Sequence, residues 1–463
     1  MLPPLPSVPA TTAESRIHYV LQHFWQAYDA MPTVSIGYAG TQPQVEVTAV
    51  AHDFFAGTAP YPAPPVWREW QGRQLPFLFD DQPARPLLEL LPGGRARVQA
   101  DVVSAAFYLL SGWQEFYSSE RDQHGRFPYA ASVQQRYGFV TVPVVNYYFE
   151  VLRAAVEHAG GQPLRPRGWA DGRAWATFIT HDIDNLYSAW KAPAKAALQR
   201  RNWLDFARRY WQHLTQKDVW DNLTEVQQTV AKYGAKSTFF FLPEHRKAAN
   251  GTPNADYRIQ KAWPMVVALE KQGAEIGLHA SYRTDTNEHS SSEFLWEVER
   301  VTSQETGQNT GIRFHYLRWE PRLMPYIFSS WVQFAYDSTL GFAEHYGFRN
   351  SYCLPFRPFV FQRREAADFL EIPLNVMDAT LHHPKYLQLA PEEILPALTP
   401  MFQEIERFGG VCTVLWHNEN FDPANTRNGP REFRALMEYL CSRNVAFVNG
   451  SDICQSFQPP LSS

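Results

Sequence analysis

The C-terminal two thirds of the chain alternate short apolar runs with amphipathic stretches. Eight runs are rich in aromatic and β-branched residues and have the length of buried strands: 175–180, 236–242, 274–278, 312–316, 332–336, 370–376, 410–416 and 445–449. Helical spacing of apolar residues lies between most of them, at 222–233, 258–272, 293–305, 395–408 and 430–443. Strands that alternate with helices predict a parallel sheet, and about eight such repeats predict a (β/α) barrel or a distorted relative of one.

The N-terminal third has a different pattern. Helical spacing of apolar residues occurs at 15–30, 101–117 and 143–158, while residues 34–56 alternate as strands do. The stretch 160–173 (GGQPLRPRGWADGR) is dense in turn-forming residues and indicates a domain boundary. We therefore predict an α/β protein in which a smaller α/β domain (1–165) precedes the distorted barrel (172–463).

Ionisable side chains follow the predicted strands at one recurring place. These side chains are His181, Asp182, Asp184, His279, His315, Arg318, Asp337, Asp378, His417 and Asp452. Barrel active sites are built where the carboxyl ends of the strands meet. The pattern predicts a catalytic or ligand-binding site at that end of the barrel.

Two carboxylates stand two residues apart, directly after the first strand of the barrel. Asp182 and Asp184 can serve one site with different tasks, one as the ligand of a cation and the other as a free base. A purely structural alternative is that Asp184 caps the turn that begins with Asn185.

Three further side chains complete this candidate site. His279 ends the strand at 274–278, where an imidazole is placed to bind a metal. We expect the guanidinium of Arg318 to orient Asp182, because arginine binds carboxylates with two parallel hydrogen bonds. His417 follows a buried strand and is placed to give a proton to a leaving group. A surface ion pair for Arg318 and a buried core histidine for His417 are the structural alternatives.

Charge and cysteine content narrow the class of protein. A net charge of −5 argues against broad nucleic-acid binding. No C-x-x-C spacing occurs, so we expect buried, reduced thiols at Cys353, Cys412, Cys441 and Cys454. The chain shows no secretion signal and no apolar run long enough to span a bilayer, so we expect a cytoplasmic protein.

Residues 187–217 combine basic side chains with tryptophans. Seven lysines and arginines stand against Asp205, and Trp190, Trp203 and Trp211 lie among them. We expect a solvated helix that packs its tryptophans inward. The alternative is a helix that makes peripheral contact with an anionic membrane surface.

The candidate site residues, in their order along the chain, resemble the motifs of the NodB-homology polysaccharide deacetylases, carbohydrate esterase family 4. The resemblance covers roughly residues 172–455. The segment THDID is similar to the family's first motif, which implies that Asp182 is the catalytic base and Asp184 a metal ligand. EIGLHAS resembles the second motif and implies that His279 is a ligand. HYLRW resembles the third, in which Arg318 would hold the base, and LWHN resembles the fifth, in which His417 would be the general acid.

The fourth motif of the family, which lines the pocket, is similar to residues 336–340 (YDSTL). The side chains that we expect to contact substrate are His315, Trp319, Tyr336, Asp337 and Trp416. Residues 101–146 resemble the N-terminal domain of one branch of this family, whose members resemble accessory enzymes of bacterial surface-polysaccharide synthesis.

One departure from the family concerns the metal. The resemblance implies a divalent cation, expected to be zinc, but the family's second histidine is replaced by Arg283, which cannot ligate a metal. A catalytic zinc has three protein ligands and an open position. The third ligand is expected from His315, Asp285 or His289, unless the metal is weakly bound or absent.

The implied activity is metal-assisted hydrolysis of the N-acetyl group of an amino sugar in a bacterial glycan or its precursor. Two alternatives stay open. One is a non-catalytic carbohydrate-binding protein on a degenerate barrel, and the other is a hydrolase of a different C–N bond or of an O-acetyl group.

Overall fold

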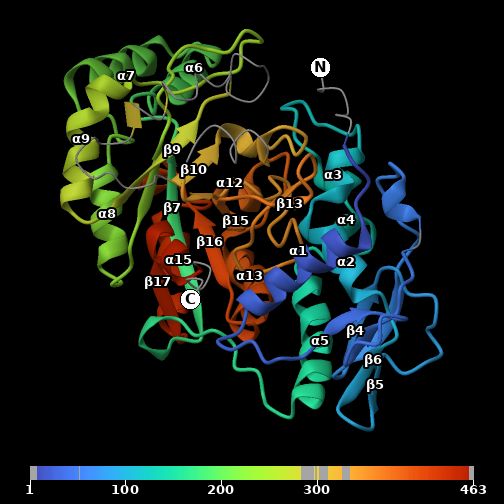
Figure 1. The fold of residues 1–463 in the computed structure, drawn as a ribbon. Coiled ribbons are helices and arrows are strands. Elements are labelled where there is room, and N and C mark those ends of the chain that lie inside the picture. Colours follow the sequence, from blue (N-terminus) through green and yellow to red (C-terminus); the bar gives the residue numbers. More distant parts are fainter. Residues whose placement is uncertain are drawn as a thin grey trace.

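The computed structural model describes residues 8–51, 53–282, 297, 300–301, 311–325 and 334–457 (Figure 1). The strands of the C-terminal part are β7 (Trp175–Ile183), β8 (Thr238–Phe241), β9 (Glu275–Ala280), β10 (Gly311–Phe314), β11 (Tyr336–Asp337), β14 (Leu370–Glu371), β15 (Leu374–Met377), β16 (Val411–Leu415) and β17 (Val445–Val448). Each of the eight predicted apolar runs therefore overlaps a strand, although the run 332–336 does so only at Tyr336. The helix expected at 293–305 lies almost entirely outside the described residues.

All nine strands belong to one parallel sheet. Its order is β14-β11-β10-β9-β8-β7-β16-β15. The strand β17 pairs with the first half of β7, and β8 pairs with the second half of β7 along the same edge. The strands β14 and β15 stand at opposite ends of this order, yet only two residues separate them in the chain. The sheet therefore curves round on itself, which confirms the predicted distorted (β/α) barrel.

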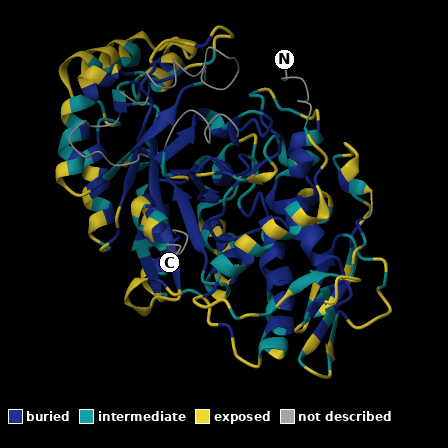
Figure 2. Ribbon diagram, in the orientation of Figure 1, coloured by how far each residue is buried: buried dark blue, intermediate teal, exposed yellow. Residues whose placement is uncertain are grey.

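Helices cover the outside of the barrel (Figure 1). They are α6 (Lys191–Gln199), α7 (Trp203–Thr215), α8 (Leu223–Ala231), α9 (Ile259–Lys271), α12 (Asp378–His382), α13 (Pro391–Arg407), α14 (Pro430–Cys441) and α15 (Gly450–Ser456). Enclosure by helices explains why the first half of β7 is mostly apolar. All nine of its residues are buried, and the sheet forms the dark interior of Figure 2.

The N-terminal part is a second α/β unit. A four-stranded sheet has the order β1-β2-β6-β5, formed by β1 (Ile36–Tyr38), β2 (Val45–Val47), β5 (Leu88–Leu91) and β6 (Arg95–Val98). A separate hairpin joins β3 (Val66–Trp70) to β4 (Arg73–Phe77). The helices are α1 (Ala13–Gln26), α2 (Val102–Leu110), α3 (Trp113–Tyr117), α4 (Val133–Arg136) and α5 (Val144–Gly160). The sequence predicted α1, α2 and α5, and it missed the strands between residues 66 and 98.

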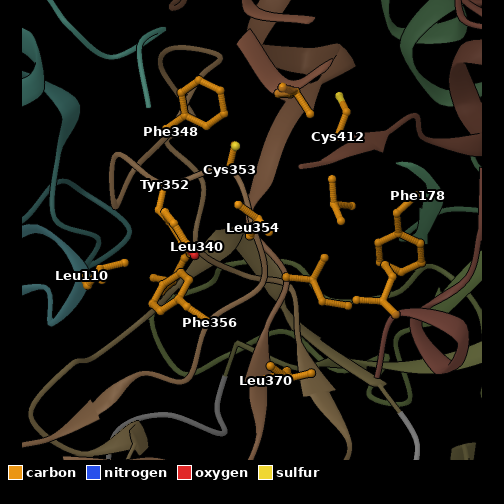
Figure 3. Close-up of a cluster of buried hydrophobic side chains, with 14 of the residues drawn as sticks. Leu110, Phe178, Leu340, Phe348, Tyr352, Cys353, Leu354, Phe356, Leu370 and Cys412 are labelled. Carbon is orange, nitrogen blue, oxygen red and sulfur yellow. The ribbon is translucent and has the colours of Figure 1, made fainter. Parts of the chain in front are cut away.

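One apolar core runs through both parts. In Figure 3, Leu110 of α2 and Phe178 of β7 lie on opposite sides of Tyr352 and Phe356, which come from the segment between β11 and β14. The ring of Phe107 meets that of Phe359 edge to face, with centroids 4.9 Å apart. The two parts therefore share a continuous interior. Among the described helices, none combines the length and apolarity that crossing a bilayer requires.

Candidate active site

Two carboxylates lie where β7 ends. Asp182 is in the strand and Asp184 follows it, so their side chains point to the same side of the extended backbone. The side chain of Asp182 is 3% exposed and that of Asp184 is 21% exposed. Asp182 therefore lies deeper inside the barrel than Asp184, which is partly exposed to solvent at the end of the barrel.

Asp184 lies against two imidazoles. Its Oδ1 is 3.4 Å from Nε2 of His279 and 3.4 Å from Nδ1 of His315, and these two nitrogens are 3.0 Å apart. His279 comes from β9, and His315 follows the neighbouring strand β10. Three metal-binding side chains thus offer one atom each, all within 4.8 Å of one another.

Backbone carbonyls orient both imidazoles. Nδ1 of His279 donates to the carbonyl of Arg313 at 2.9 Å, and Nε2 of His315 donates to the carbonyl of Pro253 at 3.3 Å. In the neutral rings the remaining nitrogens, which face Asp184, therefore carry lone pairs. Such a hydrogen bond on the far nitrogen is typical of metal-binding histidines.

The charges of this cluster fit a divalent cation. Oδ1 of Asp184 is buried and has no hydrogen-bond partner among the described residues. Burial lowers the pKa of His315 to about 4 against the pull of Asp184, so its Nδ1 is free to bind a metal at neutral pH. Burial also opposes the charge of His279, but Asp182 and Asp184 outweigh it and raise its pKa. A cation bound at this point would take the place of that proton.

A buried arginine holds Asp182. Nη1 of Arg313 in β10 donates to Oδ1 of Asp182 at 2.9 Å and to Oγ1 of Thr180 at 2.8 Å. The other guanidinium nitrogens donate to the carbonyl and the hydroxyl of Ser338. Because β8 and β9 separate β10 from β7 in the sheet, this side chain crosses the barrel interior.

The expectation that Arg318 orients Asp182 is wrong. Arg318 follows β10 and donates to the carbonyl of Tyr282 at 2.7 Å, with its guanidinium over the ring of that tyrosine. Arg313 and His315 alternate on one face of the segment, which points into the barrel. That alternation within the predicted strand was the signal that identifies Arg313.

His417 and Asp378 form a pair at the same end of the barrel. Nδ1 of His417 donates to Oδ1 of Asp378 at 2.7 Å, and the backbone N–H of His417 donates to Oδ2 at 2.6 Å. Burial alone would lower the pKa of His417, but the charge and hydrogen bond of Asp378 raise it to about 10. Nε2 of His417 is 4.0 Å from Oδ2 of Asp184. Asp378 follows the predicted strand at 370–376, but the sequence did not assign it a catalytic role.

The residues expected to contact substrate are mostly in the core. His315 belongs to the cluster with Asp184 and His279 that could hold a metal ion. Trp319 is 3% exposed near Phe369, and Trp416 is fully buried against Phe433. The substrate assignments of the two tryptophans are wrong, because their rings complete the packing around the barrel.

Tyr336 and Asp337 are also fully buried. The hydroxyl of Tyr336 donates to Glu275, which begins β9 and lies at the opposite end of that strand from His279. Its ring occupies the space beside Gly311, where a Cβ would be only 1.9 Å from it. The carboxylate of Asp337 accepts hydrogen bonds from Thr339. Both are therefore structural residues, and their assignment to the substrate site is wrong.

Asp285 and His289, the other candidates for the third ligand, lie outside the described residues, as does Arg283. Among the side chains that the structure does describe, His315 is the one that joins Asp184 and His279.

Comparison with known proteins identifies two families along the chain. Residues 212–322, which include His279, Arg313 and His315, match the polysaccharide deacetylase family. Residues 10–160 match a family of unknown function, DUF7033. No curated protein matches the chain.

Several solved structures also match, at low identity. A putative polysaccharide deacetylase from Mycobacterium smegmatis is 15% identical, and the match covers 62% of this chain and 91% of that one, with a TM-score of 0.41. A probable polysaccharide deacetylase from Pseudomonas aeruginosa PAO1 is 14% identical, with coverage of 64% and 95% and a TM-score of 0.41. The family match stands on the segment that carries the histidine cluster. The family matches support a NodB-homology polysaccharide deacetylase domain that is preceded by an extra N-terminal domain, DUF7033.

Proposed function

We propose that this chain is a metal-dependent deacetylase that hydrolyses the N-acetyl group of an amino sugar in a bacterial glycan or its precursor. One observation carries the proposal. Asp182, with its own arginine, and His417, with its own carboxylate, both border the cluster of Asp184, His279 and His315. A metal-binding site, a base and an acid thus lie within one small volume.

The cation would be held by Asp184, His279 and His315, which leaves a further coordination position open. A divalent cation bound there lowers the pKa of a water and polarises an acyl oxygen. We expect zinc, because two imidazoles and one carboxylate are ligands that zinc accepts.

Asp182 is proposed as the base. Arg313 occupies its Oδ1, and Oδ2 lies 3.7 Å from Nε2 of His279, on the side of the cluster. This free oxygen is placed to take the proton of the attacking water. The hydrogen bond from Arg313 keeps the carboxylate in one orientation, so that the reaction does not bear the entropic cost of orienting it.

His417 is proposed as the acid. Asp378 keeps its imidazole protonated and directs Nε2 towards Asp184. When the tetrahedral intermediate breaks, this N–H gives its proton to the sugar nitrogen. The products are a free amine and acetate.

A group of partly exposed aromatic rings next to His315 is proposed as the sugar contact. The ring of Tyr316 is 5.6 Å from that of Tyr282, which it meets edge to face, and it stacks on His124 of the N-terminal part. Aromatic rings commonly line small-molecule sites. We place the boundary between the two domains between residues 165 and 172. His124 then belongs to the first domain and Tyr282 and Tyr316 to the second, so both domains would border the substrate.

Acetate release from defined substrates tests this function. Purified protein would be assayed with oligomers of N-acetylglucosamine and with an O-acetylated glycan, after its metal content has been measured. We expect stoichiometric metal and release from the N-acetylated substrate, abolished in Asp182→Asn and retained in Asp368→Asn, a carboxylate whose side chain is 74% exposed.

Two outcomes would contradict the proposal, and each would indicate a different function. Release from the O-acetylated substrate alone would make the chain an esterase. Binding of glycan with neither bound metal nor acetate release would make it a carbohydrate-binding protein.

A further inference from the structure

The helix α7 turns its apolar side away from the protein. Its exposed apolar residues are Trp203 (67% exposed), Leu204 (86%), Tyr210 (46%), Trp211 (67%) and Leu214 (60%). At about 100° per residue these positions form one stripe roughly 120° wide. No residue of α7 is buried, and α6 and α7 show long exposed stretches at the upper left of Figure 2.

The inward side of α7 is largely polar. Its half-buried positions are Asp205, Phe206, Arg209 and His213, and the last of these stacks on Trp190 at 4.4 Å. A surface helix of a globular protein normally faces its apolar side to the core. In α7 the arrangement is reversed. The expectation that the tryptophans pack inward is therefore wrong for Trp203 and Trp211.

Positive charge surrounds this apolar stripe. Residues 191–215 contain six lysines and arginines and one acidic residue, Asp205, although the whole chain has a net charge of −5. Arg200, Arg208 and Arg209 share the carboxylate of Asp205 at 3.9, 3.3 and 3.1 Å. Most of the positive charge of α6 and α7 is therefore not neutralised within this segment.

We propose that the hairpin of α6 and α7 docks on an anionic phospholipid membrane. Tryptophan and tyrosine favour the boundary between lipid and water, and lysine and arginine are attracted to anionic headgroups. An amphipathic helix with these two features lies in the plane of the membrane surface. The six lysines and arginines beside the stripe complement the negative charge of such a surface.

The docked hairpin would bring the barrel end close to the membrane. Lys191, the first residue of α6, follows Asp184 by seven residues, and Figure 1 shows both helices at the end of the barrel towards which β7 runs. If the proposed deacetylase function holds, this placement suits a glycan carried on a lipid. The docking itself does not depend on that function.

Vesicle binding by the full chain tests the proposal. The protein would be sedimented with vesicles of phosphatidylglycerol, of phosphatidylcholine, and of an equimolar mixture of the two. We expect binding that increases with phosphatidylglycerol content and decreases with added salt. Replacement of the stripe (Trp203→Ser with Trp211→Ser) and of the charge (Arg200→Gln with Arg208→Gln) should each weaken binding at least about tenfold.

Matched controls replace exposed apolar residues elsewhere. Trp67→Ser and Leu90→Ser remove side chains that are 49% and 56% exposed in the N-terminal part, and they should bind vesicles as the wild type does. Thermal unfolding verifies that every variant is folded.

The proposal fails if phosphatidylglycerol vesicles do not retain the folded protein, or if both hairpin variants bind normally. It also fails if analytical ultracentrifugation finds a dimer that Trp203→Ser with Trp211→Ser dissociates. The stripe would then be a contact between two copies of the chain.

Discussion

The imidazole of His124 stacks on the ring of Tyr316, with centroids 4.6 Å apart and planes 11° from parallel. Nη1 of Arg126 also donates to the carbonyl of Tyr316 at 3.1 Å. Tyr316 has a φ of 61°, in the left-handed region that aromatic residues rarely adopt. A loop of the N-terminal part therefore stabilises the turn that directly follows the candidate ligand His315.

Replacement of His124 should weaken substrate binding. In His124→Ala the ring of Tyr316 loses a stacking contact, and we expect KM to rise about two- to tenfold. The kcat and the bound metal should stay close to wild type, because His124 touches none of the proposed ligands. Steady-state kinetics on an N-acetylated oligomer measures this, with His158→Ala, an exposed histidine of the same domain, as control. An unchanged KM, or loss of the metal, would contradict the proposed role of this loop in substrate binding.

Replacement of Arg313 should reduce the chemical step. Lysine at this position keeps the charge but cannot hold Asp182, Thr180 and Ser338 together, so we expect kcat to fall about a hundredfold or more while the metal is retained. The matched variant is Arg318→Lys, which should leave kcat near the wild-type value. A larger loss in the Arg318 variant than in the Arg313 variant would restore Arg318 as the residue that orients the base.

Metal binding should depend on His315. We expect Asp184→Asn, His279→Ala and His315→Ala each to lower zinc affinity more than about a hundredfold, because each removes one of three ligands. His289→Ala and Asp285→Asn, at positions outside the described residues, should retain the metal. Titration of the metal-free protein with zinc, followed by calorimetry, distinguishes the two sets. Loss of zinc in His289→Ala with retention in His315→Ala would identify the other histidine as the third ligand.

Glu371 makes stability depend on pH. It is fully buried and lies against Asp337, and burial followed by that charge raises the pKa of Glu371 well above its usual value. Between the unfolded-state pKa of about 4.3 and the raised folded-state pKa, the folded protein holds a proton that the unfolded chain releases. The free energy of unfolding should therefore fall as pH rises through this window, by up to about 1.4 kcal/mol per pH unit.

Glu371→Gln removes this effect. The amide stays neutral, so the variant should gain stability relative to the wild type between about pH 5 and about pH 8. Urea unfolding at both pH values measures the difference. Parallel pH profiles for the two proteins would show that Glu371 carries no such proton.

A buried ion pair joins the two parts of the chain. Arg349 donates to both carboxylate oxygens of Glu115 in α3, at 2.8 and 2.6 Å, and both side chains are at most 3% exposed. Glu115→Gln leaves a buried charge without its partner and should cost about 3–5 kcal/mol of unfolding free energy. Glu365→Gln, in an exposed pair with Arg363, should cost less than about 1 kcal/mol. Equal losses in denaturant unfolding would mean that the buried pair contributes no more than the exposed one.

The positions of the barrel strands could be predicted because the signal is local. A run such as 175–180 is buried on both faces and consists of apolar residues and threonine, so it can be found without knowledge of its neighbours. The strands β3 (VWREW) and β6 (RARV) are short and mix charged with apolar residues. Their pattern is too weak to separate from loops, which is why the sequence missed them.

The sequence also determined which ionisable residues stand at strand ends, and four of them, Asp182, Asp184, His279 and His417, do meet at one end of the barrel. Only the tertiary structure decided which of the two arginines of one short segment, Arg313 or Arg318, binds Asp182. It also decided that His315 joins the cluster of Asp184 and His279. Arg313 reaches Asp182 across 131 residues of chain and the whole barrel interior. That contact depends on which face of a strand points inward and on the curvature of the sheet, and neither is contained in the local spacing of residues.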